Sequence, residues 1–492
     1  MRTARAELGR RLGTLIVGFS TSACAEDVID HGNSGITGYP TTSPARVCGS
    51  AALQGGPASV PPGAVSVAAG DNSGVDFGKA DTTYWFAPGV HTLGPDQIGP
   101  ADNSTFIGAP GAILDGQNVK PAAFSQHAVN VRIAYLEIRN FASPNDEGVV
   151  NHDGGTGWII ENNYLHQNTG AAVFVSSYST LRDNCVSDNG QYGLQGIGPG
   201  GGGSGVDLVI DHNEIAHNGE AATDHLGGGA KVWNIDGASV THNWIHDNLG
   251  IGLSVDANSR DFAIEGNLFA DNYGEAIYYG ISYNAQIRGN SLQRNALGKG
   301  ADFAARGDDF PVAAVYVSES GGDRRVSGTP TLEISRNHFE NNWGGVVLWE
   351  SADRFCGSPT AARSGYCTIV SADATPTTCA QPDIATAPLY DDCRWKTQKV
   401  IVQSNEFHVA PANIGCTNEL CARQAILSNA GSTPPYVGTA VEDAITFTQD
   451  NHFSQNRYFG PWRFTAHDTS VVMNFAAWQA PPYAQDQGST LE

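Results

Sequence analysis

The sequence is poor in basic residues. It has 27 lysines and arginines against 50 aspartates and glutamates, which gives a formal net charge of −23. Because a phosphate-binding surface needs a positive field, this balance argues against nucleic acid or an anionic membrane surface as a partner. A polyanionic substrate would need bound cations to help it dock.

The chain also lacks an apolar run long enough to span a bilayer. Near the N-terminus the run Leu12 to Phe19 follows four arginines and precedes Ala23, Cys24 and Ala25, whereas a membrane-spanning helix needs about 20 apolar residues. Residues 1–25 are therefore predicted to be a secretory signal peptide. Lipid anchoring through Cys24 and export by a twin-arginine route stay open as alternatives.

Cysteine is sparse outside one segment. Six of the nine cysteines fall within residues 351–425, at positions Cys356, Cys367, Cys379, Cys393, Cys416 and Cys421. In an oxidising compartment this crowding predicts about three disulfides in an irregular insertion, with the connectivity left open. The spacings match no zinc finger or ribbon pattern, so zinc ligation is not favoured.

What the sequence has in abundance is glycine, 59 residues, and a repeated asparagine pair. Two asparagines five positions apart, with short alternating apolar runs around them, recur every 20 to 30 residues through the middle of the chain. This pattern predicts stacked coils of two or three short strands, with turn asparagines stacking on those of the next coil. The pairs are Asn163/Asn168, Asn184/Asn189, Asn213/Asn218, Asn243/Asn248, Asn267/Asn272, Asn290/Asn295, Asn337/Asn342 and Asn451/Asn456.

The repeats predict one solenoid rather than several globular domains. We expect a flexible leader over residues 26–75, with order beginning near Tyr84, and coils over residues 76–350. The cysteine-rich insertion, with further strands, spans residues 351–425, and a last coil and cap span 426–492. The expected chain is a monomer with no membrane span.

Roughly residues 80 to 470 resemble the right-handed parallel β-helix proteins of the pectate-lyase-like superfamily. Phrases such as "HDNLGIGLSVD", "EAIYYGISYNAQIRGN" and "WGGVVLWE" are more narrowly similar to a group of secreted actinobacterial β-helix proteins. The resemblance implies an all-β fold, a single-stranded right-handed parallel β-helix with a disulfide-bonded irregular C-terminal region. It implies less about function, because that superfamily includes lyases, hydrolases, epimerases and non-catalytic adhesins.

The constant spacing of the asparagines lets the coils be aligned on one another. One outward row is predicted to contain Trp233, Asp256, Gly280, Ser318 and Glu350. A second outward row, two residues earlier, is predicted to contain Lys231, Ser254, Tyr278, Tyr316 and Leu348. The residues between them are expected to point into the core: Val232, Val255, Val317 and Val347.

These two rows predict a sugar-binding cleft on the outside of one sheet. Aromatic faces stack on sugar rings, and carboxylates supply acid, base or cation ligands. The leading hypothesis is a secreted glycoside hydrolase with Asp256 and Glu350 as catalytic carboxylates. Gly280 weakens a close-pair mechanism, because the resemblance leads us to expect a glutamate there. The expected substrate-binding residues are Trp233, Tyr278, Tyr316, Tyr283 and Glu275.

Two alternatives stay open, and short catalytic motifs such as a nucleophile elbow, a phosphate loop or a zinc-protease signature are absent. A polysaccharide lyase would use Lys231 as the base, with Asp256 and Asp224 holding Ca²⁺; a hydrolase would need no cofactor. A non-catalytic glycan-binding or surface-structural protein would use the aromatic residues alone. The simplest competing interpretation is a surface ion pair between Lys231 and Asp256.

Overall fold

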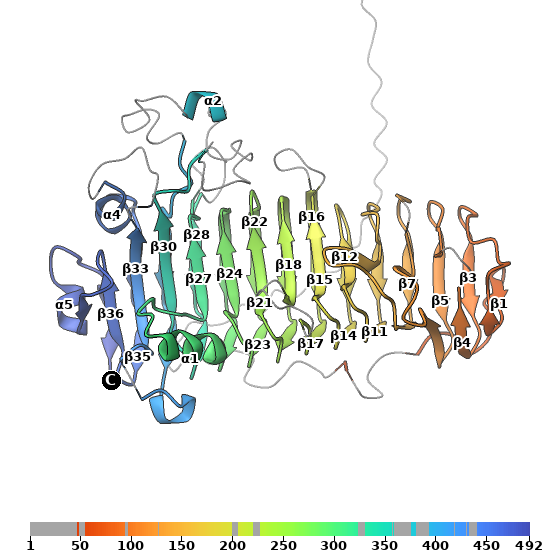
Figure 1. The fold of residues 1–492 in the computed structure, drawn as a ribbon, viewed down its shortest axis with the longest axis horizontal. Coiled ribbons are helices and arrows are strands. Elements are labelled where there is room, and N and C mark those ends of the chain that lie inside the picture. Colours follow the sequence, from red (N-terminus) through yellow and green to blue (C-terminus); the bar gives the residue numbers. More distant parts are fainter. Residues whose placement is uncertain are drawn as a thin grey trace, which may run out of the picture. The chain divides into compact units, whose positions relative to one another are not determined.

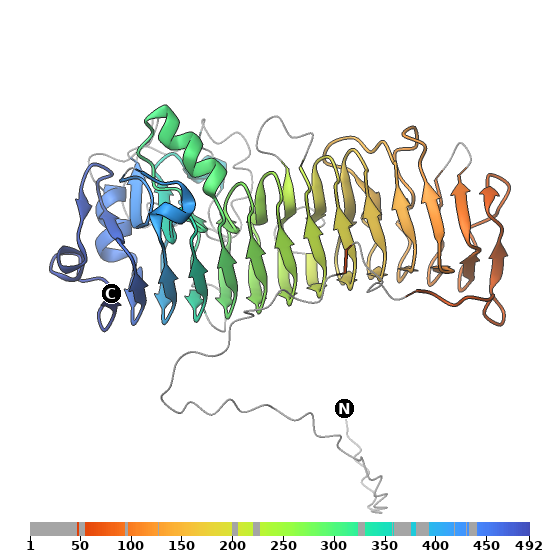
Figure 2. The same cartoon turned by 90° about the horizontal axis from the view of Figure 1, so that it is seen from below.

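Short parallel strands stack in three long sheets along the chain (Figures 1 and 2). The computed structural model describes residues 47–48, 55–93, 97–125, 127–198, 205–219, 227–322, 330–356, 358, 375–379, 393–417, 419–429, 431 and 440–492. The chain divides into residues 1–37 and 38–492. The first unit, with the predicted signal peptide and Cys24, lies outside the described residues, and all three sheets belong to the second unit.

From β7 (Arg132–Ala134) to β36 (Arg463–Ala466) each coil contributes one strand to each sheet, whereas the first three coils contribute to two sheets; successive coils pair in parallel. The 13-stranded sheet contains β1 (Val65–Val67), β3 (Thr83–Phe86), β5 (Thr105–Gly108), β7 (Arg132–Ala134), β10 (Ile159–Glu161), β13 (Thr180–Arg182), β16 (Gly205–Asp211), β19 (Ile235–Thr241), β22 (Arg260–Glu265), β25 (Tyr283–Arg288), β28 (Leu332–Ser335), β31 (Val400–Gln403) and β34 (His452–Ser454). The 14-stranded sheet contains β2 (Gly70–Asp71), β4 (Gly89–Thr92), β6 (Ala112–Asp115), β8 (Glu137–Arg139), β11 (Tyr164–His166), β14 (Cys185–Ser187), β17 (Glu214–Ala216), β20 (Trp244–His246), β23 (Leu268–Ala270), β26 (Ser291–Gln293), β29 (His338–Glu340), β32 (Glu406–His408), β35 (Arg457–Phe459) and β38 (Thr490–Leu491).

The 11-stranded sheet bears the candidate site. It contains β9 (Gly148–Val150), β12 (Ala171–Val175), β15 (Tyr192–Ile197), β18 (Gly228–Trp233), β21 (Ile251–Asp256), β24 (Ile277–Gly280), β27 (Val315–Ser318), β30 (Val346–Ser351), β33 (Arg423–Asn429), β36 (Arg463–Ala466) and β37 (Val472–Met473). Among these strands, only β37 runs antiparallel to its neighbour, β36. The predicted parallel β-helix is therefore confirmed.

Helical segments are short. They are α1 (Leu297–Arg306), α2 (Pro376–Cys379), α4 (Ala440–Asp443), α5 (Phe475–Gln479), the 3₁₀ helix η1 (Pro411–Ile414) and the π-helix η2 (Ala444–Thr448). Among the described residues, none of the helices has the length and apolar character needed to cross a membrane.

One contiguous apolar core runs through the coils. In β21, Leu253 and Val255 are fully buried in it, whereas Ser254 and Asp256 face outward. This alternation follows from the two-residue period of a strand, in which successive side chains point to opposite faces. Val232, Val255 and Val317 lie in the core as predicted.

Asparagine side chains stack into two buried ladders at the turns. Asn243 shows the pattern: its Nδ2 donates to Asn267 Oδ1 over 3.0 Å, and its Oδ1 accepts from Asn213 Nδ2 over 3.0 Å. The first ladder continues from Asn337 through Asn405 to Asn456. The search for asparagine pairs missed Asn405, because no asparagine follows it five residues later. It also took Asn456 as the second member of a pair, whereas the structure places it in the first ladder.

The prediction of a flexible leader over residues 26–75 is wrong for the part that the structure describes. Cys48 forms a disulfide with Cys185 of β14, and the backbone N–H groups of Val47 and Cys48 each donate to Glu214 Oε2 over 2.7 Å. Strands β1 and β2 also precede Tyr84. The cross-link spans 137 residues, which neither Cys48 nor Cys185 signals by its local sequence.

Disulfides occur in the C-terminal region, as predicted. Cys379 pairs with Cys393, Cys416 pairs with Cys421, and Cys356 is also disulfide-bonded. Tyr283, predicted to bind substrate, is instead buried in a small cluster that includes Cys379, Cys393 and Trp395. Its hydroxyl accepts a hydrogen bond from the backbone N–H of Lys396 over 3.2 Å.

Candidate functional site

The outer face of the 11-stranded sheet carries most of the predicted rows. Pairing places Trp233 opposite Asp256 and Gly280 opposite Ser318. It also places Lys231, Ser254, Tyr278 and Tyr316 in one row. The predicted register is therefore correct from β18 to β27.

The register prediction is wrong at β30. Tyr316 pairs with Val347 and Ser318 pairs with Trp349, so Trp349 stands in the row assigned to Glu350. Asn342 is seven residues before Trp349, whereas Asn248 is eight residues before Asp256. The turn before β30 is therefore one residue shorter than the turn before β21. A slip of one residue exchanges the two faces of a strand. Leu348 accordingly lies in the core, and Val347 lies outside it under Phe310.

Glu350 is a buried structural carboxylate and not part of a cleft. Its side chain is fully buried in an ion pair with Arg394. It accepts hydrogen bonds from the Thr397 backbone N–H over 3.0 Å and from Gln449 Nε2 over 2.6 Å. The Asp256–Glu350 catalytic pair that the sequence suggested is therefore excluded.

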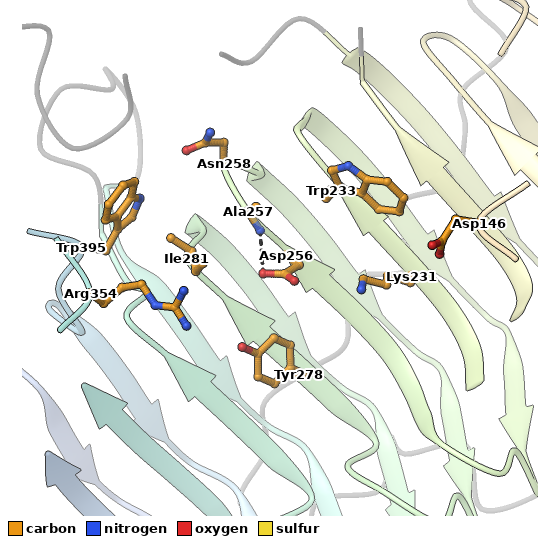
Figure 3. Close-up of a pocket in the computed structure, with 10 residues that line it drawn as sticks. All are labelled: Asp146, Lys231, Trp233, Asp256, Ala257, Asn258, Tyr278, Ile281, Arg354 and Trp395. Carbon is orange, nitrogen blue, oxygen red and sulfur yellow. Dashed lines mark hydrogen bonds between the residues drawn. The ribbon is translucent and has the colours of Figure 1, made fainter. Parts of the chain in front are cut away.

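A cavity of about 330 Å³ opens beside Asp256 (Figure 3). Lys231 and Arg354 extend toward Asp256 from opposite sides, and the Tyr278 ring lies next to it. The cavity brings together four residues that the sequence singled out, Lys231, Trp233, Asp256 and Tyr278. Its lining consists of Asp146, Lys231, Trp233, Asp256, Ala257, Asn258, Tyr278, Ile281, Arg354 and Trp395.

Lys231 is held by aromatic rings. Its Nζ lies 5.8 Å from the ring centroid of Trp233 and 5.9 Å from that of Tyr192. Lys231 and Asp256 are both among the described residues, and their charged atoms are more than 4.0 Å apart. The predicted surface ion pair between them is therefore not formed. Asp256 Oδ1 instead accepts from the backbone N–H of Ala257 over 2.8 Å.

Tyr278 occupies the space that a side chain at position 280 would need. A Cβ atom built on Gly280 would lie 2.5 Å from the Tyr278 hydroxyl and 2.4 Å from its ring. Burial raises the pKa of Tyr278, and the carboxylates of Asp256 and Glu319 raise it further. The phenol is therefore held protonated beside Asp256, in the place where the resemblance led us to expect a glutamate.

Glu319 is a carboxylate behind the cavity that the sequence alignment did not single out. It is 1% exposed; its Oε2 accepts from Ser318 Oγ over 2.5 Å and its Oε1 from the Ser351 N–H over 2.8 Å. Arg354 Nε lies 4.0 Å from Oε2. Burial raises the pKa of Glu319, with Arg354 opposing the shift. Glu319 directly follows the last residue of β27, Ser318, and its own backbone is left-handed, with φ 47°. The two-residue period of a strand does not predict where the side chain of such a residue points.

Two other predicted substrate-binding residues lie away from the cavity. Tyr316 packs against Phe310 and Tyr278, with ring centroids 5.8 Å and 5.5 Å away. Glu275 is 3% exposed and pairs with Lys299 of α1 over 2.5 Å. Both are therefore packing residues under the segment that follows β26. Asp224, the predicted second calcium ligand, lies outside the described residues.

Six of the cavity residues were not predicted, because they lie outside the aligned strands; Asp146, Arg354 and Trp395 are the three of them that come from the longer connections. Asp146 precedes β9, and its Oδ1 accepts from Gln191 Nε2 over 3.1 Å. Arg354 and Trp395 belong to the cysteine-rich insertion, two residues before Cys356 and two residues after Cys393. Long connections on a rigid scaffold commonly supply site residues, but their positions depend on tertiary folding.

Comparison with known proteins supports the fold. The family model described as "Right handed beta helix region" matches residues 198–322. The chain is a right-handed parallel β-helix. No curated protein matches the sequence.

Several solved structures are similar in backbone. The A-module of mannuronan C-5 epimerase AlgE6 from Azotobacter vinelandii is 17% identical, with a TM-score of 0.37, over 59% of this chain and 82% of that one. The catalytic domain of a GH87 alpha-1,3-glucanase in complex with nigerose is 11% identical, with a TM-score of 0.44, over 89% of this chain and 67% of that one. XylC in complex with xylose is 13% identical, with a TM-score of 0.41, over 76% of this chain and 54% of that one. Similarity this low carries no inference about activity.

Proposed function

We propose that this chain is a secreted enzyme that cleaves a uronate-containing polysaccharide by β-elimination in the cavity beside Asp256. The observation that carries the proposal is the Tyr278 phenol next to Asp256, with Lys231 and Arg354 on either side. Trp233 supplies a ring face on which a sugar can stack.

The residues divide the elimination among themselves. Arg354 and Lys231 pair with the uronate carboxylate and stabilise the negative charge that develops on it. Asp256 takes the proton from the carbon next to that carboxylate. The Tyr278 hydroxyl gives its proton to the departing glycosidic oxygen as the carbon–oxygen bond breaks and a carbon–carbon double bond forms.

Lys231 has a different role in this reaction from the one that the sequence suggested. Here Lys231, which lies 5.8 Å and 5.9 Å from two aromatic ring centroids, binds the substrate carboxylate, and Asp256 is the base. The two cations also supply positive charge that Ca²⁺ would otherwise supply. The calcium-dependent alternative therefore predicts that a chelator abolishes activity, whereas our proposal predicts that activity is unchanged by a chelator.

Hydrolysis is the second candidate, because two carboxylates, Asp146 and Asp256, line the same cavity. Inverting hydrolases use a pair about 6.5–9.5 Å apart, with a water molecule between them. A hydrolase would release reducing ends without forming an unsaturated uronate.

The test is to incubate the purified protein with uronic and neutral glycans and to follow both reducing ends and the ultraviolet absorbance of unsaturated uronate. We expect both signals with a uronic glycan, and a loss of at least about 100-fold in Asp256→Asn and Tyr278→Phe. Tyr316→Phe is the matched control, since that tyrosine is in the same row but does not line the cavity. Reducing ends alone would favour hydrolysis; binding without either product would favour the non-catalytic alternative.

A further inference from the structure

Two neighbouring strands of the 14-stranded sheet carry the same residue types in opposite order. The sequence of β29 is His338-Phe339-Glu340, and that of β32 is Glu406-Phe407-His408. His338 pairs with Glu406 and Glu340 pairs with His408. The central phenylalanines are buried and stack with ring centroids 4.4 Å apart. Strand alternation therefore places two imidazoles and two carboxylates in a square on the outer face.

The atoms of this square are spaced like the ligands of a metal ion. Glu406 Oε2 lies 3.7 Å from His338 Nδ1 and 3.6 Å from His408 Nε2, and the three ligand atoms all lie within 4.8 Å of one another. These separations exceed the roughly 2.7–3.2 Å of an N–H···O hydrogen bond. A tetrahedral zinc ion with bonds of about 2.0–2.1 Å holds its ligand atoms about 3.3 Å apart.

Neighbouring side chains orient the ligands. Arg457 donates to Glu406 Oε1 over 2.7 Å, which leaves Oε2 directed at the two histidines. Phe459 stacks on His408 with centroids 4.2 Å apart and an angle of 11° between the rings. Glu340 Oε2 lies 3.6 Å from His338 Nε2. Partners that fix the ligands in this way are characteristic of built metal sites.

We propose that His338 Nδ1, His408 Nε2 and Glu406 Oε2 bind a first-row divalent metal ion such as Zn²⁺, with water completing the coordination. Imidazole and carboxylate ligands suit this class of ion. The site is on a different sheet from the cavity beside Asp256, so its role is independent of the proposed function. It joins two strands that are neighbours in space but are separated by residues 341–405, which include part of the cysteine-rich segment. The ion would clamp the coil from which that segment leaves.

The test uses untagged, chelator-treated protein. Titration with Zn²⁺ in a calorimeter and the visible absorption spectrum of added Co²⁺ report binding and ligand geometry. We expect His338→Gln and His408→Gln each to remove one bound ion per chain and to abolish the rise in Tm that zinc causes in the wild type. His452→Gln is the matched control, because His452 is exposed on another sheet beside Asp450, and it should bind as the wild type does.

Unchanged zinc stoichiometry in both variants, or no binding by the wild type, would overturn the proposal. A second cluster, Asp211, His212 and His242, is also spaced for an ion, so His242→Gln distinguishes ions bound there from those bound at His338. Circular dichroism verifies that each variant folds. If a histidine variant does not fold, Glu406→Gln, which keeps both imidazoles, replaces it and should weaken zinc binding at least about tenfold.

Discussion

The asparagine ladders and the outer row of the 11-stranded sheet run along the same coils but differ in how far their residue types repeat from one coil to the next. In the ladder the same residue recurs, and Asn243 both donates to and accepts from its neighbours. The outer row changes at every coil: Trp233, Asp256, Gly280, Ser318 and Trp349. A buried turn without water needs the same hydrogen-bonding group at each level, whereas an exposed face does not. In a repeat protein, chemistry is therefore to be sought where the repeats differ.

The largest effect is expected at Glu350, which the sequence assigned to the outer row and the structure places inside. Glu350→Gln removes the charge that pairs with buried Arg394. Leaving one member of a buried ion pair uncompensated costs about 3–5 kcal/mol in the free energy of unfolding. Denaturant unfolding measures this loss, with Glu442→Gln in α4 as the control. Lost turnover with unchanged stability would return Glu350 to the catalytic site.

The next effect tests the ladder itself. Asn243→Ala removes hydrogen bonds to Asn267, Ile210 and Thr241 and leaves the Asn213 N–H without its acceptor. Because unpaired buried groups cost about 1–3 kcal/mol each, we expect a loss of about 3 kcal/mol in unfolding free energy, measured by denaturant titration. The exposed Asn413→Ala should change it by less than about 0.5 kcal/mol. Equal effects at the two positions would contradict the structural role of the ladder.

A smaller effect is expected at Gly280, where the outer row lacks a side chain. A Cβ atom there would overlap the Tyr278 ring, so Gly280→Ala should displace the phenol from Asp256. We expect about a tenfold loss of turnover, equivalent to about 1.4 kcal/mol in the activation barrier, measured by steady-state kinetics. Gly74→Ala, where a Cβ meets nothing within 4 Å, is the control. Unchanged turnover would mean that the position of Tyr278 is not important.

The smallest effect concerns the pH dependence of stability at Glu319. The pKa of Glu319 is raised in the folded chain above the ordinary value of 4.5. At a pH between 4.5 and this raised pKa, the native state therefore holds a proton that the unfolded state has lost. The carboxyl therefore lowers the free energy of unfolding as pH rises through this window. Glu319→Gln should remove that loss, so its stability relative to wild type should rise with pH.

Urea unfolding at a series of pH values above 4.5 measures this difference for Glu319→Gln. A difference that stays flat or falls with pH would show that the Glu319 pKa is not raised. Tyr278→Phe in the same series gives a reference, because the raised pKa of that phenol keeps it uncharged throughout.

Much of the site was predictable because strands repeat every two residues and the turns before β21 and β24 have equal length. Asp256 and Tyr278 were placed in that way, and Lys231 by matching its strand to the next one along the chain. The prediction failed at Glu350, where one missing turn residue reverses the strand faces. The spacing also gave no information on Arg354 or Trp395, which come from the cysteine-rich segment.

The sequence by itself determined the β-helix, the ladders and the rows of the central coils, because those depend on local periodicity and on a spacing that recurs. Only the tertiary structure decided that Tyr278 covers Gly280, that Glu350 is buried against Arg394, and that Arg354 reaches the cavity. Each of these depends on contacts between residues far apart in the chain or on the space left by a neighbouring side chain. No local pattern encodes them.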